Sequence, residues 1–536
     1  MRKLLVANRG EIALRVFRAC HELGIATVAV VAPDDNGALH ARSADEAVEI
    51  AGYLHSEEHV RAAEATGADA IHPGYGFLAE NADFADAVQA AELTWVGPPP
   101  AALRAGGDKL EAKRLAQEAN VPVVPTGDAQ ELGFPLVVKA AAGGGGRGMR
   151  VVRAAADLDD GLDAARREAR TAFGDDRVFC ERYVERPRHV EIQILGDAHG
   201  TVVALGEREC SVQRRHQKVL EESPSPAVDE PLRRAMSDAA LRFAQAIAYE
   251  SAGTAEFMLD GRDFYFLELN GRIQVEHPVT ELVTGVDLVA AQLRIAQGEH
   301  APAAAEPRGH AVEVRLYAED PRTFLPQTGR ITRLRLPSSI RVDAGVAEGD
   351  EIGIAYDPMI AKLIASGETR EEALRRLRAA LDETVVDGVT TNLPFLRWLV
   401  AHPALRAGAT TTAFLTEHPP LSRPPLRLPE GPWRGSFRLN LPAAAPSPAP
   451  DVDAAASGGQ DGAGEQSSVT APMPGTVIKV LVAAGETVQP RQPLVVLEAM
   501  KMETPLTSPY EAVVRAVNVA EGDRVAGGAV LVELEE

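Results

Sequence analysis

The chain has 536 residues, 45% of them apolar and 25% charged, so it is long enough for several domains with buried cores. Its formal net charge of −22 at pH 7 excludes the basic surface expected of a protein that binds nucleic acid or an anionic membrane. No run approaches the roughly 20 apolar residues that span a bilayer, and the three cysteines form neither a metal-binding spacing nor a disulfide framework. We therefore expect a reduced, cytoplasmic protein.

The first 110 residues are predicted to form an α/β domain. Residues 3–8 are typical of a buried strand, apolar residues at helical spacing predict a helix from Ile12 to Leu23, and residues 27–32 predict the next strand. This βαβ pattern indicates a parallel sheet. Residues 111–309 then mix helices with alternating strands, and residues 310–415 predict an α+β domain with a helix at 370–381.

The C-terminal part has a different composition. Residues 416–468 hold a proline-rich stretch and then an Ala/Pro/Ser/Gly/Asp tract from 441, which is typical of a flexible linker. Residues 469–536 are rich in valine with regular glycines, an all-β pattern. A shift of 37 residues lays Val477 on Val514 and Gly485 on Gly522, so two similar halves are predicted to pack as a flattened barrel.

Lysine is rare in the chain, which has 47 arginines and eight lysines. A surviving lysine can mark a place that needs a compact ammonium or a nucleophilic amine. The eight are Lys3, Lys109, Lys113, Lys139, Lys218, Lys362, Lys479 and Lys501. Four of them lie in the motifs below, although a coding bias would leave the same number by chance.

A glycine run at 143–148 follows a strand-like segment. Successive glycines let backbone N–H groups converge on phosphate oxygens, and Lys109 and Lys139 could add positive charge there. The run does not end in Gly-Lys-Ser/Thr, so it is not a Walker P-loop. A plain flexible loop is the alternative interpretation.

Two glutamates flank a predicted hairpin over residues 253–270. A three-residue loop, Gly261 to Asp263, would place Glu256 opposite Glu268, whereas a two-residue Asp260-Gly261 loop would put them on opposite faces. Opposed carboxylates need a cation between them, and Mg²⁺ fits that need. Polar residues continue to alternate through 276, so we expect the same strand to run on to Glu276 as a possible base. Solvated glutamates on an exposed face are the alternative.

These segments together resemble the alpha subunit of bacterial acyl-CoA carboxylases, in which a biotin carboxylase and its biotin carrier share one chain. The resemblance covers residues 1–415 and 469–536. It rests on five motifs: His72–Leu78, the glycine run, Gln213–Lys218, Asn270–Pro278 and Glu498–Glu503. It implies an α/β plus α+β multidomain fold, with an ATP-grasp biotin carboxylase, a linker and an all-β biotinyl domain.

The resemblance also implies roles for individual residues. ATP would be bound by Lys109, Lys139, Gly144, Gly145, Gly146, Glu181, Val184, His189, Gln213 and His216. Mg²⁺ or Mn²⁺ would be held by Glu256, Glu268 and Asn270. Bicarbonate would be bound by Lys218, Arg272, Gln274 and Val275 and deprotonated by Glu276, and Arg315 would stabilise the enolate of biotin. Lys501, between two methionines, would carry the covalent biotin.

The same resemblance implies partners. The residues after the linker are too few for a carboxyltransferase as well as the carrier, so we expect a separate beta subunit that binds the acyl-CoA. A biotin protein ligase for Lys501 and an oligomeric assembly are also implied. Acetyl- or propionyl-CoA carboxylase is the favoured activity. A 3-methylcrotonyl-CoA or pyruvate carboxylase, or a carrier with an inactive ATP-grasp part, are alternatives.

Overall fold

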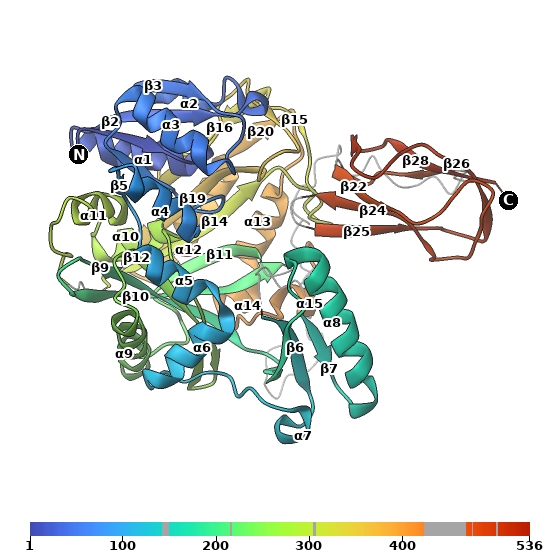
Figure 1. Cartoon of the computed structure of the whole chain (residues 1–536), viewed down its shortest axis with the longest axis horizontal. Coiled ribbons are helices and arrows are strands. Elements are labelled where there is room, and N and C mark those ends of the chain that lie inside the picture. Colours follow the sequence, from blue (N-terminus) through green and yellow to red (C-terminus); the bar gives the residue numbers. More distant parts are fainter. Residues whose placement is uncertain are drawn as a thin grey trace, which may run out of the picture.

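The computed structural model describes residues 1–141, 149–214, 217–303, 307–422, 468–473, 475–499 and 502–535 (Figure 1). The predictions for Gly144, Gly145, Gly146, His216, the linker and Lys501 lie outside these residues. No helix in the described ranges is long and apolar enough to cross a membrane.

The N-terminal residues form the parallel sheet that the βαβ pattern predicts, with strand order β3-β2-β1-β4-β5. Its strands are β1 (Lys3–Val6), β2 (Ala26–Val31), β3 (Glu46–Glu49), β4 (Ala70–His72) and β5 (Thr94–Trp95). The helical segments here are α1 (Gly10–Glu22), η1 (Pro33–Asp35), α2 (Leu39–Ser43), α3 (Ser56–Thr66), α4 (Ala82–Ala90) and α5 (Pro100–Gly107). Helix α1 buries Ile12, Val16 and Cys20, the face that its spacing predicts.

The turn after β4 packs against the end of β1. Asn8 donates from Nδ2 to the carbonyl oxygens of Pro73 (2.8 Å) and Tyr75 (2.7 Å). Gly74 has a φ of +64°, and a Cβ there would lie 2.8 Å from Asn8 Nδ2. Only glycine combines this backbone conformation with so close an approach.

The centre of the molecule is an antiparallel sheet in the order β13-β12-β9-β10-β11-β14-β19-β17 (Figure 1). Its strands are β9 (Arg188–Gly196), β10 (Val202–Arg214), β11 (Gln217–Ser223), β12 (Ser251–Asp260), β13 (Asp263–Asn270), β14 (His310–Tyr317), β17 (Arg341–Ala344) and β19 (Met359–Gly367). Helices α9 (Glu230–Ala246), α10 (His277–Thr284) and α12 (Arg370–Glu383) pack on it. Since β11 pairs with β14, this one sheet joins residues on both sides of position 309.

A smaller lobe stands apart from the central sheet, drawn in teal in Figure 1. It holds the sheet β7-β6-β8, with β6 (Leu136–Ala140), β7 (Arg150–Val152) and β8 (Val178–Arg182). Helix α8 (Leu158–Phe173) packs against these strands, while α6 (Lys109–Glu118), α7 (Ala129–Leu132) and η2 (Ala155–Asp157) lie nearby in the chain.

The remaining elements complete the part of the fold that ends at residue 422. They are α11 (Leu288–Ile295), β15 (Gly329–Arg330), β16 (Arg333–Arg335), β18 (Glu351–Ile352), β20 (Val385–Asp387), α13 (Leu393–Ala401), α14 (Pro403–Arg406) and α15 (Phe414–Glu417). A large apolar core that includes Leu363, Leu377 and Phe395 lies between α12, α13 and the central sheet.

The C-terminal residues form two four-stranded sheets, β21-β28-β26-β23 and β25-β24-β22-β27. The strands are β21 (Ser468–Thr470), β22 (Gly475–Val480), β23 (Thr487–Val488), β24 (Pro493–Ala499), β25 (Met502–Thr507), β26 (Ala512–Val517), β27 (Arg524–Val525) and β28 (Val530–Glu535). The 37-residue shift carries β22 onto β26 and β23 onto β27, so each sheet reproduces the other. The predicted internal repeat is confirmed.

Candidate functional site

Two carboxylates face each other at one edge of the central sheet. Glu256 is paired directly with Glu268, one of the two arrangements that the sequence left open, but the loop is neither of the two considered. The loop is the two residues Gly261 and Arg262, and a register shift leaves Leu267 unpaired. This β-bulge restores the register that the shorter loop would have lost.

The same pair suits a divalent cation. Burial, followed by the charge of Glu256, raises the pKa of Glu268. Among the described residues, no ion pair or hydrogen bond involves the Glu268 carboxylate, and Asn270 lies beside Glu256 (Nδ2 to Oε1 2.8 Å). Two carboxylates and an amide are oxygen donors of the kind that Mg²⁺ and Mn²⁺ prefer. The residues therefore fit the metal that the sequence predicts.

The ammonium group of Lys218 occupies the centre of the site. Its Nζ lies 2.8 Å from Glu256 and 2.7 Å from Glu276, and it also contacts Glu191. Burial alone would lower the pKa of Lys218, but the three carboxylates raise it well above its ordinary value. Lys218 is therefore a fixed positive charge in a buried site.

Glu276 is held between two cations. Lys218 contacts one of its carboxylate oxygens, and Arg315 donates to the other from Nη2 (2.9 Å). Burial is the largest influence and would raise the pKa of Glu276, but Lys218, Arg315 and Arg208 outweigh it and hold the pKa well below its usual range. The carboxylate is ionised at neutral pH and can accept a proton.

Arg315 has a second acidic neighbour. Its guanidinium also contacts Glu221, a fully buried carboxyl group on β11. Burial is the main reason that the pKa of Glu221 is raised to about 7, and the negative charge of Glu276 adds to it. Arg315 is thus fixed by acids on two sides, with its guanidinium next to the proposed base.

The segment from Arg272 to Glu276 is not a strand, contrary to the expectation from its alternating pattern. β13 ends at Asn270, and α10 begins at His277. The guanidinium of Arg272 donates to Gln274 (2.9 Å), while its Nε donates to Glu80 (2.9 Å). The polar side chains are gathered by these contacts, since no strand pairing holds this segment.

The predicted nucleotide residues lie on the smaller lobe and its neighbours. Lys139 of β6 lies 2.6 Å from Glu181 of β8, and Lys113 of α6 contacts the same carboxylate. Burial and the charge of Lys109 lower the pKa of Lys139 to about 8, and burial, Lys139 and Lys109 lower that of Lys113 to about 7. Val184 is buried in the chain just after β8. Crowded cations of this kind are expected where an anionic ligand binds.

Two other predicted nucleotide residues lie nearer the carboxylate pair. His189 of β9 is 2.8 Å from Glu256, whose charge raises the pKa of His189 despite burial, the larger influence, which lowers it. Gln213 of β10 is paired with Lys218 of β11. The structure therefore places His189 beside Glu256, a predicted metal ligand, and Gln213 beside Lys218, a predicted bicarbonate residue.

Sequence reasoning missed several residues of the site. Glu191 accepts from both Lys218 and Arg208, Glu80 holds Arg272, and Glu221 holds Arg315. A signal for Glu191 was present, because His189, Glu191 and Gln193 alternate with apolar residues along β9. Glu80 and Glu221 carry no such signal in the sequence.

Family models cover almost all of the described chain. Residues 1–103 match the biotin carboxylase N-terminal domain, and 313–417 match the biotin carboxylase C-terminal domain. Residues 108–303 match the ATP-binding domain of the carbamoyl-phosphate synthase L chain, and 467–534 match the biotin-requiring enzyme family. A propionyl-CoA carboxylase alpha chain from Ruegeria pomeroyi is 47% identical over 80% of this chain and 70% of its own length. The chain belongs to the biotin carboxylase family.

Two further members of the family match long stretches of this chain. A biotin-dependent acyl-coenzyme A carboxylase alpha3 subunit from Mycobacterium leprae is 42% identical over 99% of this chain and 98% of its own length. The biotin carboxylase domain of a Hydrogenobacter thermophilus 2-oxoglutarate carboxylase, solved with MgADP and bicarbonate, has a TM-score of 0.76 at 43% identity, covering 78% of this chain and 98% of that one. The chain is an ATP-dependent ligase of the alpha-subunit type, a biotin carboxylase joined to a biotin carrier domain.

Proposed function

We propose that this biotin carboxylase carboxylates biotin held on its own Lys501, and that it serves an acetyl- or propionyl-CoA carboxylase. The observation that carries the proposal is the buried set in which Lys218 and Arg315 hold the ionised Glu276 next to the Glu256–Glu268 pair. An inactive remnant would have no need to keep so many charges buried, since each costs free energy to remove from water.

The bicarbonate step follows from these charges. Bicarbonate is a poor electrophile, so transfer of the γ-phosphoryl group of ATP to one of its oxygens activates it and releases ADP. Lys218 and Arg272 supply fixed positive charge for the anion, Gln274 and the backbone of Val275 complete its binding site, and Glu276 takes its proton. Positioning and neutralisation of charge account for most of the rate in such transfers.

The metal and the nucleotide occupy the neighbouring positions. Glu256, Glu268 and Asn270 would hold Mg²⁺ or Mn²⁺, which supplies positive charge for the phosphates when bound. Lys109 and Lys139 face the phosphates, with Glu181 and Val184 beside the base. The crowding of ammonium groups that lowers the pKa of Lys139 is relieved when an anion enters.

The biotin reaches this site from the carrier domain. β24 and β25 are paired as far as Ala499 and Met502, the described residues on either side of Lys501. The composition of the 28 residues 441–468 predicts a flexible linker, and a coil of that length would have an r.m.s. reach of about 30 Å. This reach suits a carrier that travels between two active sites, and Arg315 is the group we assign to the ureido oxygen of its biotin.

A separate carboxyltransferase subunit and a biotin protein ligase complete the proposed reaction. The acyl-CoA assignment is supported by the Mycobacterium leprae relative, because that alpha3 subunit matches this chain from end to end. Methylcrotonoyl-CoA carboxylase alpha subunits, such as that of Dictyostelium discoideum at 45% identity, support the alternative substrate. Purifying the tagged chain from its host and identifying the carboxyltransferase that accompanies it would decide between them.

A pair of variants tests the proposal by separating its two halves. Glu276→Gln should still be biotinylated by a biotin ligase but should lose about 10²- to 10⁴-fold of bicarbonate-dependent ADP release with free biotin, because the base is gone. Lys501→Arg should accept no biotin, as intact mass will register, and should keep full turnover of free biotin.

The two variants act as controls for each other. Biotin on the Lys501→Arg chain would overturn the carrier assignment alone. Bicarbonate-dependent ADP release that survives in Glu276→Gln would overturn the catalytic assignment alone. A wild-type chain that cleaves ATP equally with and without bicarbonate would overturn the proposed function.

A further inference from the structure

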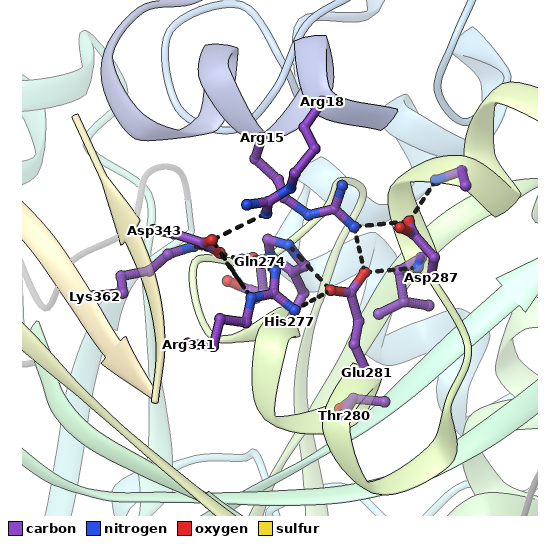
Figure 2. Close-up of polar contacts among 12 residues, drawn as sticks. Arg15, Arg18, Gln274, His277, Thr280, Glu281, Asp287, Arg341, Asp343 and Lys362 are labelled. Atoms are coloured by element: carbon purple, nitrogen blue, oxygen red, sulfur yellow. Dashed lines mark hydrogen bonds and ion pairs between the residues drawn. The ribbon is translucent and has the colours of Figure 1, made fainter. Parts of the chain in front are cut away.

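Lys362 of β19 is a buried lysine to which neither the motifs nor the resemblance gives a role. Its side chain is fully buried. The Nζ donates to the backbone oxygen of Val275 (2.9 Å) and lies 3.1 Å from the carboxylate of Glu11. It lies 3.9 Å from the carboxylate of Asp343, which Figure 2 draws beside Lys362. The ammonium group of Lys362 therefore directly contacts the segment from Arg272 to Glu276, which holds the proposed bicarbonate residues.

These contacts join three separate parts of the chain. Glu11 lies in the first turn of α1, Asp343 in β17 and Val275 in the segment before α10. Glu11 also accepts a hydrogen bond from the hydroxyl of Tyr75, in the turn after β4. Lys362 is therefore the point at which helix α1, the segment before α10 and strand β17 of the central sheet meet.

The buried ion pair is not explained by stability. Removing an ammonium and a carboxylate from water costs several kcal/mol per ion, and apolar residues of the same volume often serve a core as well or better. Asp343 has other partners, Arg341 (2.9 Å) and Arg18 (3.0 Å), so it does not need Lys362 (Figure 2). Among the described residues, Lys362 supplies two contacts that no other cation does, the one to Glu11 and the one to the oxygen of Val275.

Holding the carbonyl oxygen of Val275 also orients the backbone of Glu276, the proposed base. The peptide unit between Val275 and Glu276 is planar, so the oxygen of Val275 and the nitrogen of Glu276 turn together. The segment has no strand partner, and its preceding carbonyl, that of Gln274, is bound by Nδ1 of the buried His277 (2.7 Å). Two consecutive carbonyl groups are thus anchored by buried side chains.

We propose that Lys362 is a positioning residue for the bicarbonate step, which holds the Val275–Glu276 peptide in its productive orientation. The inference rests on the proposed function of this segment. The nucleotide residues Lys139 and Glu181 lie on β6 and β8, and among the described residues Lys362 contacts neither of these strands. Its loss should therefore affect bicarbonate and leave MgATP binding unchanged.

The test measures both Michaelis constants in variants of the whole chain. Lys362→Met should lower kcat/KM for bicarbonate about 10- to 100-fold, with KM for MgATP within about twofold of wild type. The matched control is Arg370→Met, which removes a cation from the buried Glu222 (2.6 Å) and contacts no residue of the site. Arg370→Met should lower Tm in the same way but leave both Michaelis constants unchanged.

A second variant guards against loss of the fold. Lys362→Met alone leaves the Glu11 carboxylate buried without its cation, whereas the double variant Glu11→Gln/Lys362→Met removes both charges and avoids that penalty. The amide at position 11 can still accept from Tyr75, and Asp343 keeps Arg341 and Arg18. The hold on Val275 is the contact that is not replaced. The double variant should keep a near-native Tm and show the same selective defect with bicarbonate.

The outcomes separate the two claims. If the double variant folds and its kcat/KM for bicarbonate and its KM for MgATP both equal those of wild type, Lys362 has a structural role only and the inference is overturned. An equal loss of kcat/KM for bicarbonate and for MgATP would also overturn it, because it would mean general distortion. A wild-type chain without bicarbonate-dependent ATP cleavage would overturn the proposed function, and with it the inference.

Discussion

At the proposed nucleotide end of the site Lys113 and Lys139 contact one carboxylate, Glu181, and the charge of Lys109 acts on both lysines. At the proposed bicarbonate end one lysine, Lys218, contacts three carboxylates. Burial and mutual repulsion lower the pKa of Lys113 to about 7 and that of Lys139 to about 8. Glu191, Glu256 and Glu276 instead raise that of Lys218 well above its usual value. A lysine side chain therefore has a lowered pKa at the nucleotide end and a raised pKa at the bicarbonate end.

The difference follows the charges of the two substrates. A nucleotide brings several negative charges, so its site can hold an excess of cations that the ligand neutralises when it binds. Bicarbonate brings one charge and must meet a base. The cations of its proposed site are already paired with carboxylates, so its groups are already oriented. Preorganised charges of this second kind stabilise a reacting anion without further rearrangement.

The largest effect should come from breaking the bicarbonate end. Lys218→Met leaves Glu191, Glu256 and Glu276 without their shared cation. It also removes one of the two fixed positive charges proposed to bind bicarbonate. We expect kcat/KM for bicarbonate to fall at least about 10²-fold, the scale of losing one preorganised electrostatic group. Lys479→Met, on an exposed position of the carrier strand β22, is the control and should match wild type. A Lys218→Met enzyme with normal bicarbonate kinetics would show that the charge of Lys218 does not contribute to the bicarbonate step.

A smaller and different effect should come from the nucleotide end. Lys139→Met should raise KM for MgATP roughly 10- to 100-fold, the worth of one charged hydrogen bond, and leave KM for bicarbonate unchanged. Because Lys139 loses its proton as pH rises through about 8, wild-type kcat/KM for MgATP should fall above that pH. Lys139→Met should lack this alkaline limb. Identical pH profiles for the two proteins would assign the limb to another group.

A feature of the fold could be predicted when residues close together in the sequence determine it, and could not when it joins residues far apart. The carrier repeat was predicted from the 37-residue shift, because alternation and glycine spacing are local. The opposition of Glu256 and Glu268 stayed one of two alternatives, since a bulge at Leu267 leaves no mark in an alternating pattern. The contact of Lys362 with Val275 joins positions 87 residues apart, and no local rule places them together.

The site residues divide in the same way. Lys218 ends one of the family motifs, and Glu276 ends an alternating polar stretch, so both could be singled out in the sequence. Glu80 and Glu221 look like any other glutamate in the sequence. They act through tertiary contacts with Arg272 and Arg315, which only the packing of separate elements creates.

The smallest effect should come from the carboxylate pair between the two ends. Burial and the charge of Glu256 raise the pKa of Glu268, so ionised Glu268 lowers the stability of the metal-free protein, and increasingly so as pH rises through its folded pKa. Glu268→Gln should therefore raise the Tm in EDTA by roughly 2–4 °C. It should also weaken Mn²⁺ binding, measured by calorimetry, because one anionic ligand is lost. Asp263→Asn, exposed on the same hairpin, should change neither quantity. If Glu268→Gln lowered the Tm in EDTA instead, Glu268 would be compensated within the protein, and the need for a metal between the two glutamates would disappear.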